Sequence, residues 1–225
     1  MDGRVVAVTG GHGVLGRAVV QAALARGWRV AVIDHAMGHS APDGALEIGG
    51  VDLTDPAQAD AAVGRVVERF GRLDAVLNIA GGFVWQTADD AAPAWERMFA
   101  LNLSTALHAS RAALPHLKAS DAGRIVNVGS AAALKAGAGM GAYGASKAAV
   151  HALTQSLAEE LKTTAVTVNA VLPSIIDTPA NRADMRDADP AQWVAPADLA
   201  AVILFLASPE SRAMTGALVP VTGRV

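Results

Sequence analysis

The chain has 225 residues, 52% of them hydrophobic and 17% charged, with a formal net charge of -3 at pH 7. A chain of this length can form one α/β domain with a sizeable core. It has no cysteine, which excludes disulfides, thiolate nucleophiles and sulfur metal sites, and no basic run of the kind that binds nucleic acid or an anionic membrane surface. We therefore expect a small-molecule substrate, and neither nucleic acid nor a membrane as partner.

Two features of the sequence bear on where the protein works. The amino terminus, Met1-Asp2-Gly3-Arg4, leads at once into an apolar run and lacks the long hydrophobic segment and cleavage site of a secretory signal. The longest apolar run, at 199–207, is too short to cross a bilayer. We expect a cytoplasmic protein.

Short β-branched runs alternate with longer alanine- and leucine-rich helical patterns along the whole chain. The expected strands, in chain order, are 4–9, 29–34, 46–51, 74–80, 124–130, 166–172 and 217–221. Their near-continuous apolar character is typical of a parallel sheet covered by helices on both faces. The sequence predicts a single domain over residues 1–225, a doubly wound Rossmann-type, mostly parallel sheet of about seven strands, which binds ligands at the carboxyl ends of its strands.

Four glycines, Gly10, Gly11, Gly13 and Gly16, follow the first expected strand and open a helix expected at 13–26. Each costs roughly 0.5–1 kcal/mol against alanine in regular structure, so either this is a tight strand-to-helix turn or a ligand approaches the backbone closely. Gly10, Gly13 and Gly16 lie where a dinucleotide pyrophosphate would meet the positive end of the helix. The candidate contacts in this loop are Gly10, Gly13, Val14, Leu15 and Gly16.

Acidic residues end the second and third expected strands. Asp34, 18 residues after Gly16, is either a strand-end turn residue or a carboxylate that accepts hydrogen bonds from both adenosine ribose hydroxyls and repels a 2′-phosphate. The second reading favours NAD(H) as cofactor, with NADP(H) as the other possibility. Asp52, followed by Leu53, either contacts the adenine or caps the helix that starts near Pro56.

The only tyrosine of the chain has a lysine four residues after it. Tyr143 and Lys147 share one face of a helix expected at 142–161. A phenol titrates near pKa ~10, so acid or base chemistry near neutral pH needs an adjacent cation, which Lys147 supplies. The alternative is an amphipathic helix whose two polar residues are merely neighbours. Ser130 ends the fifth expected strand, and Asn102 lies in the helix after the fourth.

Together these features resemble the short-chain dehydrogenase/reductase family over essentially the whole chain. They occur in family order: Gly10-x-x-Gly13-x-x-Gly16, Asp34, NIAG at 78–81, Asn102, Ser130, Tyr143, Lys147 and PSIIDT at 173–178. The resemblance implies that Tyr143 is the proton donor or acceptor and that Lys147 lowers its pKa and holds the nicotinamide ribose. It also implies that Ser130 hydrogen-bonds the substrate oxygen and that Asn102 anchors a water in a proton relay. Further cofactor contacts implied are Asn78, Ala80, Gly81, Pro173, Ile176 and Thr178.

Some segments depart from the common family pattern. Position 14, usually glycine, is Val14, so the loop relies on Gly13. The segments GGHGVLG at 10–16, AGGF at 80–83 and 171–193 instead resemble quinonoid dihydropteridine reductase, whose relatives lack the active-site serine that is present here as Ser130. The chain thus resembles a dihydropteridine-reductase-like branch that keeps the ordinary tetrad.

The main functional prediction is an NAD(H)-dependent oxidoreductase that transfers a hydride between nicotinamide and a carbonyl or alcohol, or a C=N centre. Quinonoid dihydropteridine reductase is the first alternative. The others are a dinucleotide-sensing binding protein without turnover and a non-redox lyase or epimerase. A complete set of Asn102, Ser130, Tyr143 and Lys147 argues against the sensor, because sensing needs no proton relay.

The remaining expectations concern the substrate and self-association. Residues 174–195, rich in Pro, Asp and Arg, are expected to form a substrate lid loop. Two helices, at 94–118 and 142–161, are apolar on more than one face, which favours a homodimer or homotetramer, with internal packing as the alternative. The side chains expected to line a substrate pocket are Phe83, Trp85, Met140 and Trp193, although tryptophans are more often core. His108, His116 and His151 have no metal-ligand spacing, so we expect them to be structural and expect no metal.

Overall fold

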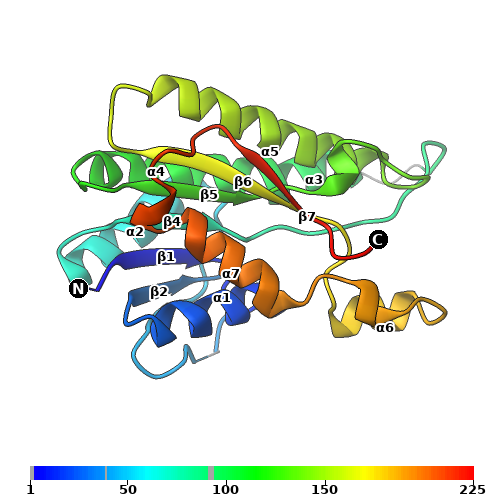
Figure 1. The fold of residues 1–225 in the computed structure, drawn as a ribbon, viewed down its shortest axis with the longest axis horizontal. Coiled ribbons are helices and arrows are strands. Elements are labelled where there is room, and N and C mark those ends of the chain that lie inside the picture. Colours follow the sequence, from blue (N-terminus) through cyan, green and yellow to red (C-terminus); the bar gives the residue numbers. More distant parts are fainter. Residues whose placement is uncertain (1–2, 39, 91–93) are drawn as a thin grey trace.

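The computed structural model describes residues 3–38, 40–90 and 94–225, so Met1 and Asp2 of the amino terminus lie outside the described residues. Its strands form one parallel sheet in the order β3-β2-β1-β4-β5-β6-β7 (Figure 1). The chain starts at the centre, builds out to one edge, crosses back and builds out to the other. The strands are β1 (Val5–Thr9), β2 (Arg29–Ile33), β3 (Leu46–Ile48), β4 (Ala75–Asn78), β5 (Arg124–Val128), β6 (Thr167–Pro173) and β7 (Leu218–Val221).

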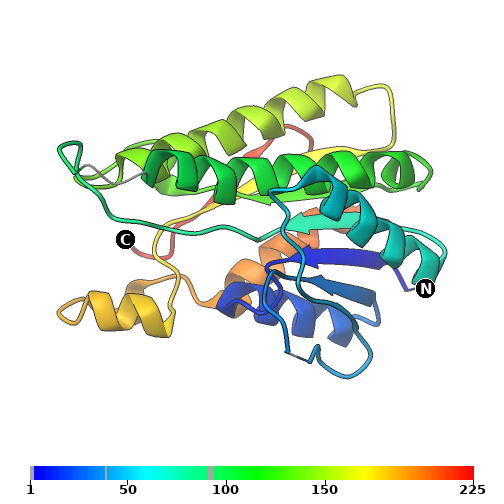
Figure 2. The same cartoon turned by 180° about the vertical axis from the view of Figure 1, so that it is seen from behind.

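Helices cover both faces of this sheet, which confirms the predicted doubly wound α/β fold. Helices α1 and α7 pack on one face, seen in Figure 1, and α2, α4 and α5 pack on the other, toward the viewer of Figure 2. In the described part of the chain no helix has the length and apolar character needed to cross a membrane. The α-helices are α1 (Val14–Ala25), α2 (Pro56–Phe70), α3 (Ala94–Phe99), α4 (Thr105–Lys118), α5 (Gly141–Glu160), α6 (Pro179–Asp184) and α7 (Pro196–Leu206).

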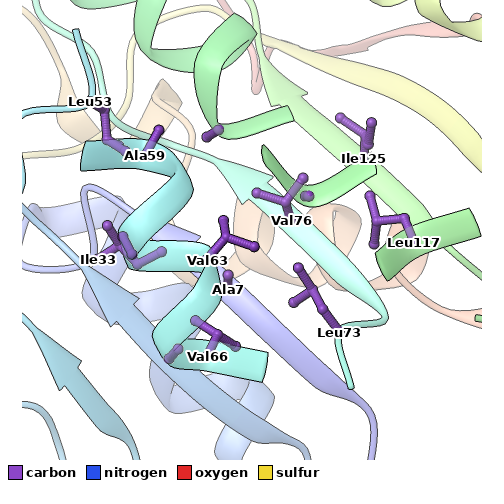
Figure 3. Close-up of a cluster of buried hydrophobic side chains, with 14 of the residues drawn as sticks. Ala7, Ile33, Leu53, Ala59, Val63, Val66, Leu73, Val76, Leu117 and Ile125 are labelled. Atoms are coloured by element: carbon purple, nitrogen blue, oxygen red, sulfur yellow. The ribbon is translucent and has the colours of Figure 1, made fainter. Parts of the chain in front are cut away.

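The apolar strands are buried from both sides. On β1, Val5 and Ala7 belong to the core layer under α2, α4 and α5, whereas Val6 and Val8 belong to the layer under α1 and α7. Successive side chains of a strand point to opposite faces, so a central strand with helices on both faces needs apolar residues at every position. Figure 3 shows the first layer, where side chains of α2 interdigitate with those of the central strands.

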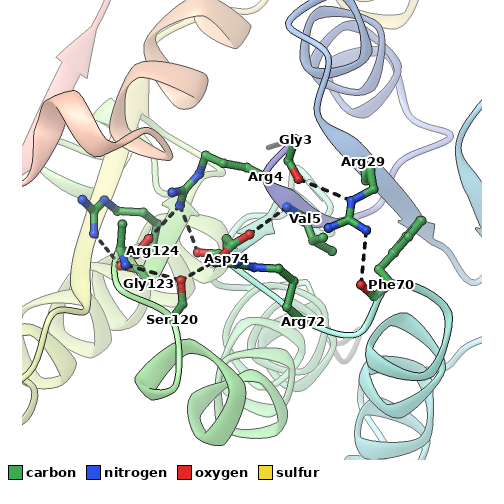
Figure 4. A network of polar contacts seen from close by, with 11 residues as sticks. Gly3, Arg4, Val5, Arg29, Phe70, Arg72, Asp74, Ser120, Gly123 and Arg124 are labelled. Atoms are coloured by element: carbon green, nitrogen blue, oxygen red, sulfur yellow. Dashed lines mark hydrogen bonds and ion pairs between the residues drawn. The ribbon is translucent and has the colours of Figure 1, made fainter. Parts of the chain in front are cut away.

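A buried polar network joins the amino ends of the strands (Figure 4). The carboxylate of Asp74, just before β4, accepts hydrogen bonds from the Val5 amide (2.9 Å), the Ser120 hydroxyl (2.6 Å) and the Arg72 guanidinium (2.7 Å). Burial acts to raise the pKa of Asp74, but these hydrogen bonds lower it overall. The network ties the strands together at their amino ends. The carboxyl ends of the strands are left free to bind a ligand.

The fourth strand is shorter than predicted because of a contact with the end of β1. The expected strand at 74–80 ends at Asn78, because the next two amides, of Ile79 and Ala80, both donate to the Thr9 hydroxyl at 3.1 Å. A backbone amide bonded to a side chain is no longer available to the sheet. The hydroxyl at the end of β1 therefore steers the chain out of the sheet at the edge where the site lies.

Candidate active site

A cavity of about 770 Å³ opens at the carboxyl ends of the strands. It extends from the loop after β1 to the segment after β6, as the open-sheet rule predicts. The lining includes these residues singled out from the sequence: Gly10, Gly13, Val14, Leu15, Gly16, Asp34, Asp52, Leu53, Ala80, Gly81, Ile176 and Thr178. Most of the expected cofactor contacts are thus brought together around one space.

The glycines of the loop have different reasons to be glycine. Gly10 has φ +64°, and a Cβ there would lie 2.8 Å from the Ala80 backbone; a Cβ on Gly16 would lie 2.2 Å from the Gly10 carbonyl oxygen. Those two are required by packing. A Cβ on Gly13 would meet only the Gly10 carbonyl oxygen, at 3.4 Å, and its φ of -67° suits any residue. Gly13 lines the cavity at the start of α1, so its lack of a side chain fits the close approach of an anionic ligand.

The carboxylate of Asp34 faces this cavity from the end of β2. Its oxygens accept from the backbone amides of His12 and Ala36, each at 2.9 Å. A carboxylate oxygen has a further lone pair, so the same two oxygens can accept hydroxyl groups of a ligand. The acceptor oxygens of Asp34 and the glycine loop therefore fit an adenine dinucleotide.

Asp52 also lines the cavity and does not cap the next helix. Its carboxylate accepts from the amide and hydroxyl of Thr54, at 2.9 and 2.7 Å, and these bonds lower the pKa of Asp52. Helix α2 is capped instead by Asp55, whose carboxylate accepts from the Ala57 amide at 2.9 Å. The helix starts at Pro56, as predicted, so its N-cap position is Asp55 and not Asp52, and the capping reading of Asp52 is wrong.

Four expected cofactor contacts do not line the cavity: Asn78 and Pro173, and Tyr143 and Lys147 of α5, which are described below. The side chain of Asn78 turns into the layer between sheet and helices, where it donates to the Ser110 hydroxyl at 2.9 Å and to the Asn127 side-chain oxygen at 2.8 Å. Pro173 is the last residue of β6, pairs with Val221 of β7 and is buried. Both residues join elements of the fold, and the cavity lining passes from Ile79 to Ala80 instead.

Asn102 lies in a break between two helices. The helix expected at 94–118 is α3 and α4 joined by a π-helical turn, Ala100–Ser104; such a turn holds an extra residue and is frequent at functional sites. The amide of Asn102 is buried: it accepts from the Gly82 amide at 2.9 Å and donates to the Gly82 carbonyl at 3.1 Å and to the Ser146 hydroxyl at 2.9 Å. It braces the loop after β4 against α5.

Tyr143 and Ser130 form a hydrogen-bonded pair beside this loop. Ser130 follows β5, and its hydroxyl also accepts from the Ala132 amide at 3.1 Å. Burial raises the pKa of Tyr143, whereas the hydrogen bond with Ser130 acts to lower it. The ring of Phe83 stands edge-on to the Tyr143 ring, 5.1 Å between centroids, and is 52% exposed.

Lys147 holds the end of β5. Its ammonium donates to the Val128 carbonyl at 2.7 Å, and burial lowers the pKa of Lys147 to about 8. The nitrogen lies 6.0 Å from the Tyr143 ring centroid. The expected lowering of the Tyr143 pKa is not seen in this structure, because the cost of burying the phenolate outweighs the hydrogen bond from Ser130.

One contact next to Ser130 was not predicted from the sequence. His151, expected to be structural, accepts from the Ser130 amide through Nε2 at 3.3 Å. Its position, eight residues after Tyr143 on the same helix, is the signal that could have revealed it. His108 contacts the Leu53 carbonyl instead, and within the described ranges no group of three His, Asp or Glu side chains could hold a metal ion.

The loop after β4 carries a second exposed aromatic side chain besides Phe83. Trp85 is 59% exposed, and its ring nitrogen donates to the Ala138 carbonyl at 3.0 Å, so the loop after β4 is tied to the loop before α5. Met140 directly precedes α5. None of the four side chains expected to line a substrate pocket, Phe83, Trp85, Met140 and Trp193, is in the cavity lining. Trp193 is buried, which supports its alternative reading as core.

The segment after β6 is more regular than expected. The predicted lid at 174–195 contains α6 and a short 3-10 helix, Pro190–Gln192. Its base is closed by a parallel bridge between Ile176 and Val194, with the Asp177 amide donating to the Val194 carbonyl at 2.9 Å. Thr178 caps α6 and lines the cavity. Residues 177–193, the clamped segment, therefore start and end at a fixed base, and Thr178, Pro179 and Ala180 of this segment line the cavity.

Comparisons with known proteins point in the same direction. A family model described as short chain dehydrogenase matches residues 4–189. The 2-(S)-hydroxypropyl-CoM dehydrogenase 3 of Xanthobacter autotrophicus is 32% identical over 99% of this chain and 96% of its own. The 3-oxoacyl-(acyl-carrier-protein) reductase FabG of Vibrio cholerae is 30% identical over 99% and 97%. A solved 3-ketoacyl-(acyl-carrier-protein) reductase from Brucella melitensis, complexed with NADH, has a TM-score of 0.89 and 28% identity over 98% and 97%.

Proposed function

Because this chain belongs to the short chain dehydrogenase family, we propose that it transfers a hydride between NAD(H) and a carbonyl or alcohol substrate, with Tyr143 as proton donor or acceptor. The observation that carries the proposal is the placement of Tyr143, Ser130 and Lys147 together at the end of β5, where Lys147 bonds the carbonyl of Val128, a residue that lines a cavity with a dinucleotide-type lining. Two relatives are named as a dehydrogenase and a reductase, which is consistent with this chemistry.

The cofactor would be held by groups along the cavity. Gly13 and the start of α1 suit the pyrophosphate, and Asp34 suits the adenosine ribose hydroxyls. A 2′-phosphate would bring further negative charge against the Asp34 carboxylate, which favours NAD(H) over NADP(H). When bound, the nicotinamide supplies or accepts the hydride.

The proton is handled by the chain's own side chains. Since burial raises the pKa of Tyr143, its hydroxyl is protonated at neutral pH and is ready to donate to a substrate oxygen in the reducing direction. The Ser130 hydroxyl donates a hydrogen bond where negative charge develops on that oxygen. Lys147, with a pKa of about 8, carries a positive charge below that pH and stabilises the phenolate left after proton transfer. Asn102 keeps the neighbouring loop in place.

The substrate side favours an apolar carbonyl compound. Phe83 presents an exposed ring beside Tyr143, and Trp85 presents another from the same loop. Apolar walls with few polar groups are typical of small-molecule sites. Cyclic or aryl ketones, aldehydes and diketones fit this description. The clamped segment would cover such a substrate as a lid.

The test is the initial rate of NADH oxidation with a panel of ketones, aldehydes, diketones and quinonoid dihydropterin, repeated with NADPH. Turnover of carbonyl compounds with NADH and loss of turnover in Tyr143→Phe would support the proposal. Turnover of the pterin alone would instead make the protein a dihydropteridine reductase in which Ser130 is a bystander. Binding of NADH without turnover of any substrate would favour a sensor.

A further inference from the structure

We propose that His151 is a positioning residue for the reaction: as a neutral hydrogen-bond acceptor, its Nε2 fixes the backbone of Ser130 so that the Ser130 hydroxyl stays against Tyr143. The effect on catalysis rests on the proposed function. The effect of His151 on the position of Ser130 does not depend on it and can be tested without a substrate. His151 is 6% exposed, and the Ser130 amide that donates to it is buried as well.

Three side chains of α5 contact the turn after β5. Tyr143, Lys147 and His151 are spaced by four residues and so lie along one face of the helix. Lys147 donates to the Val128 carbonyl at 2.7 Å, His151 accepts from the Ser130 amide at 3.3 Å, and Tyr143 bonds the Ser130 hydroxyl. The helix therefore holds the turn after β5 at consecutive points, one of which carries the substrate-facing hydroxyl.

The turn itself is shaped to accept the imidazole. A Cβ on Gly129 would lie 2.4 Å from Nε2 and 2.7 Å from Cδ2 of His151, closer than real Cβ contacts come. The Gly129 amide is bonded on the other side to the Val171 carbonyl of β6, at 2.9 Å. The turn cannot shift toward β6, and only glycine leaves space for the ring, so the ring position and the position of Ser130 determine each other.

The contact requires a neutral ring. A protonated Nε2 would be a second donor facing the Ser130 amide, and the anchor would be lost. Burial and the nearby charge of Lys147 lower the pKa of His151, which favours the neutral form. Tyr143 and Lys147 are the titratable neighbours on this stretch of α5; the turn at 129–133, the π-helical turn and β6 carry none. The other elements packed against α5 contribute only three charged side chains: Arg124 at the far end of β5, and Glu96 and Arg97 of α3, which are exposed.

Because Tyr143 is the only tyrosine, its ionisation can be followed by phenolate absorbance without interference from another phenol. The variants are His151→Leu and His151→Ile, which carry no acceptor, and His151→Gln, whose amide oxygen can accept but does not titrate. Ser130→Ala is the reference for loss of the hydroxyl, and His116→Leu on α4 is the control. Circular dichroism on the same samples verifies the fold. The test needs only one of the two apolar variants to be folded.

We expect the apolar variants to raise the pKa of Tyr143 as much as Ser130→Ala does, because the Ser130 hydrogen bond lowers that pKa. Adding His151→Leu to Ser130→Ala should raise it no further, and His151→Gln should stay near wild type. In the carbonyl assay the apolar variants should lose at least about tenfold in kcat with NADH affinity unchanged, and His151→Gln should keep activity at acid pH better than wild type. A folded apolar variant with a wild-type Tyr143 pKa would overturn the inference. Absence of carbonyl turnover in wild type would overturn the proposed function alone.

Discussion

Replacing Tyr143 by phenylalanine removes one hydroxyl and little else. The ring keeps its edge-on contact with Phe83 at 5.1 Å, and Lys147 keeps its bond to the Val128 carbonyl at 2.7 Å. A positioned general acid contributes about 10²–10⁴-fold, which is about 2.7–5.4 kcal/mol at 1.36 kcal/mol for each tenfold. The Ser130 hydroxyl remains to polarise the substrate, so we expect kcat to fall within this range while the Kd for NADH changes by less than about twofold.

Stopped-flow or steady-state NADH oxidation gives kcat for this variant, and quenching of tryptophan fluorescence gives the Kd for NADH. Thermal unfolding of the same preparation shows whether the fold is intact. A folded Tyr143→Phe protein with a kcat within about threefold of wild type would refute the assignment of the proton to this phenol. A large increase in the Kd for NADH with unchanged kcat would mean that Tyr143 serves binding.

Other changes probe the cavity, the core and a buried charge. Asp34→Asn removes a charge at the ribose end, and we expect the ratio of kcat/KM for NADH over NADPH to fall by about tenfold or more; a parent enzyme that already prefers NADPH would contradict this. Gly16→Ala should lower Tm through its 2.2 Å clash, whereas Gly13→Ala should keep Tm and raise the Kd for NADH. Ile203→Ala, in the fully buried face of α7, should lower the free energy of unfolding by about 2–5 kcal/mol in urea, against about 0.5–1.5 for Ile203→Val. For Lys147, whose pKa falls from 10.5 to about 8 on folding, the unfolded state binds more protons between these values, so wild type should gain stability with rising pH there. Lys147→Met should lack that gain in urea titrations at pH 8 and 10, and equal pH dependence would contradict the buried charge.

Much of the fold was predictable because each central strand must be apolar on both sides. The alternation of β1, with Val5 and Ala7 facing one layer and Val6 and Val8 the other, leaves a continuous run in the sequence. The ends of elements were less predictable, because they depend on side chains distant in sequence. The Thr9 hydroxyl ends β4, and no pattern within 74–80 reports this.

The candidate site was predictable where residue type and spacing carry chemistry, as for Tyr143 and Lys147. The π-helical turn around Asn102 was not, because its pattern of apolar residues reads as one continuous helix. His151 was missed because its partner is a backbone amide, which has no residue signature. Self-association through the helices at 94–118 and 142–161 stays a prediction.

Because Ile176 and Val194 pair at its base, the clamped segment can be exchanged for another loop. Since the two ends are joined by backbone hydrogen bonds, insertions between them do not pull on β6 or α7, and doubling the length of such a loop costs only about 0.6 kcal/mol of closure entropy. The surface above the cavity can therefore diverge, or be exchanged in the laboratory, while the sheet and the Tyr143–Ser130 pair stay untouched. Chimaeras that graft residues 177–192 from another enzyme of this family and keep the buried Trp193 should transfer substrate preference at little cost in folding.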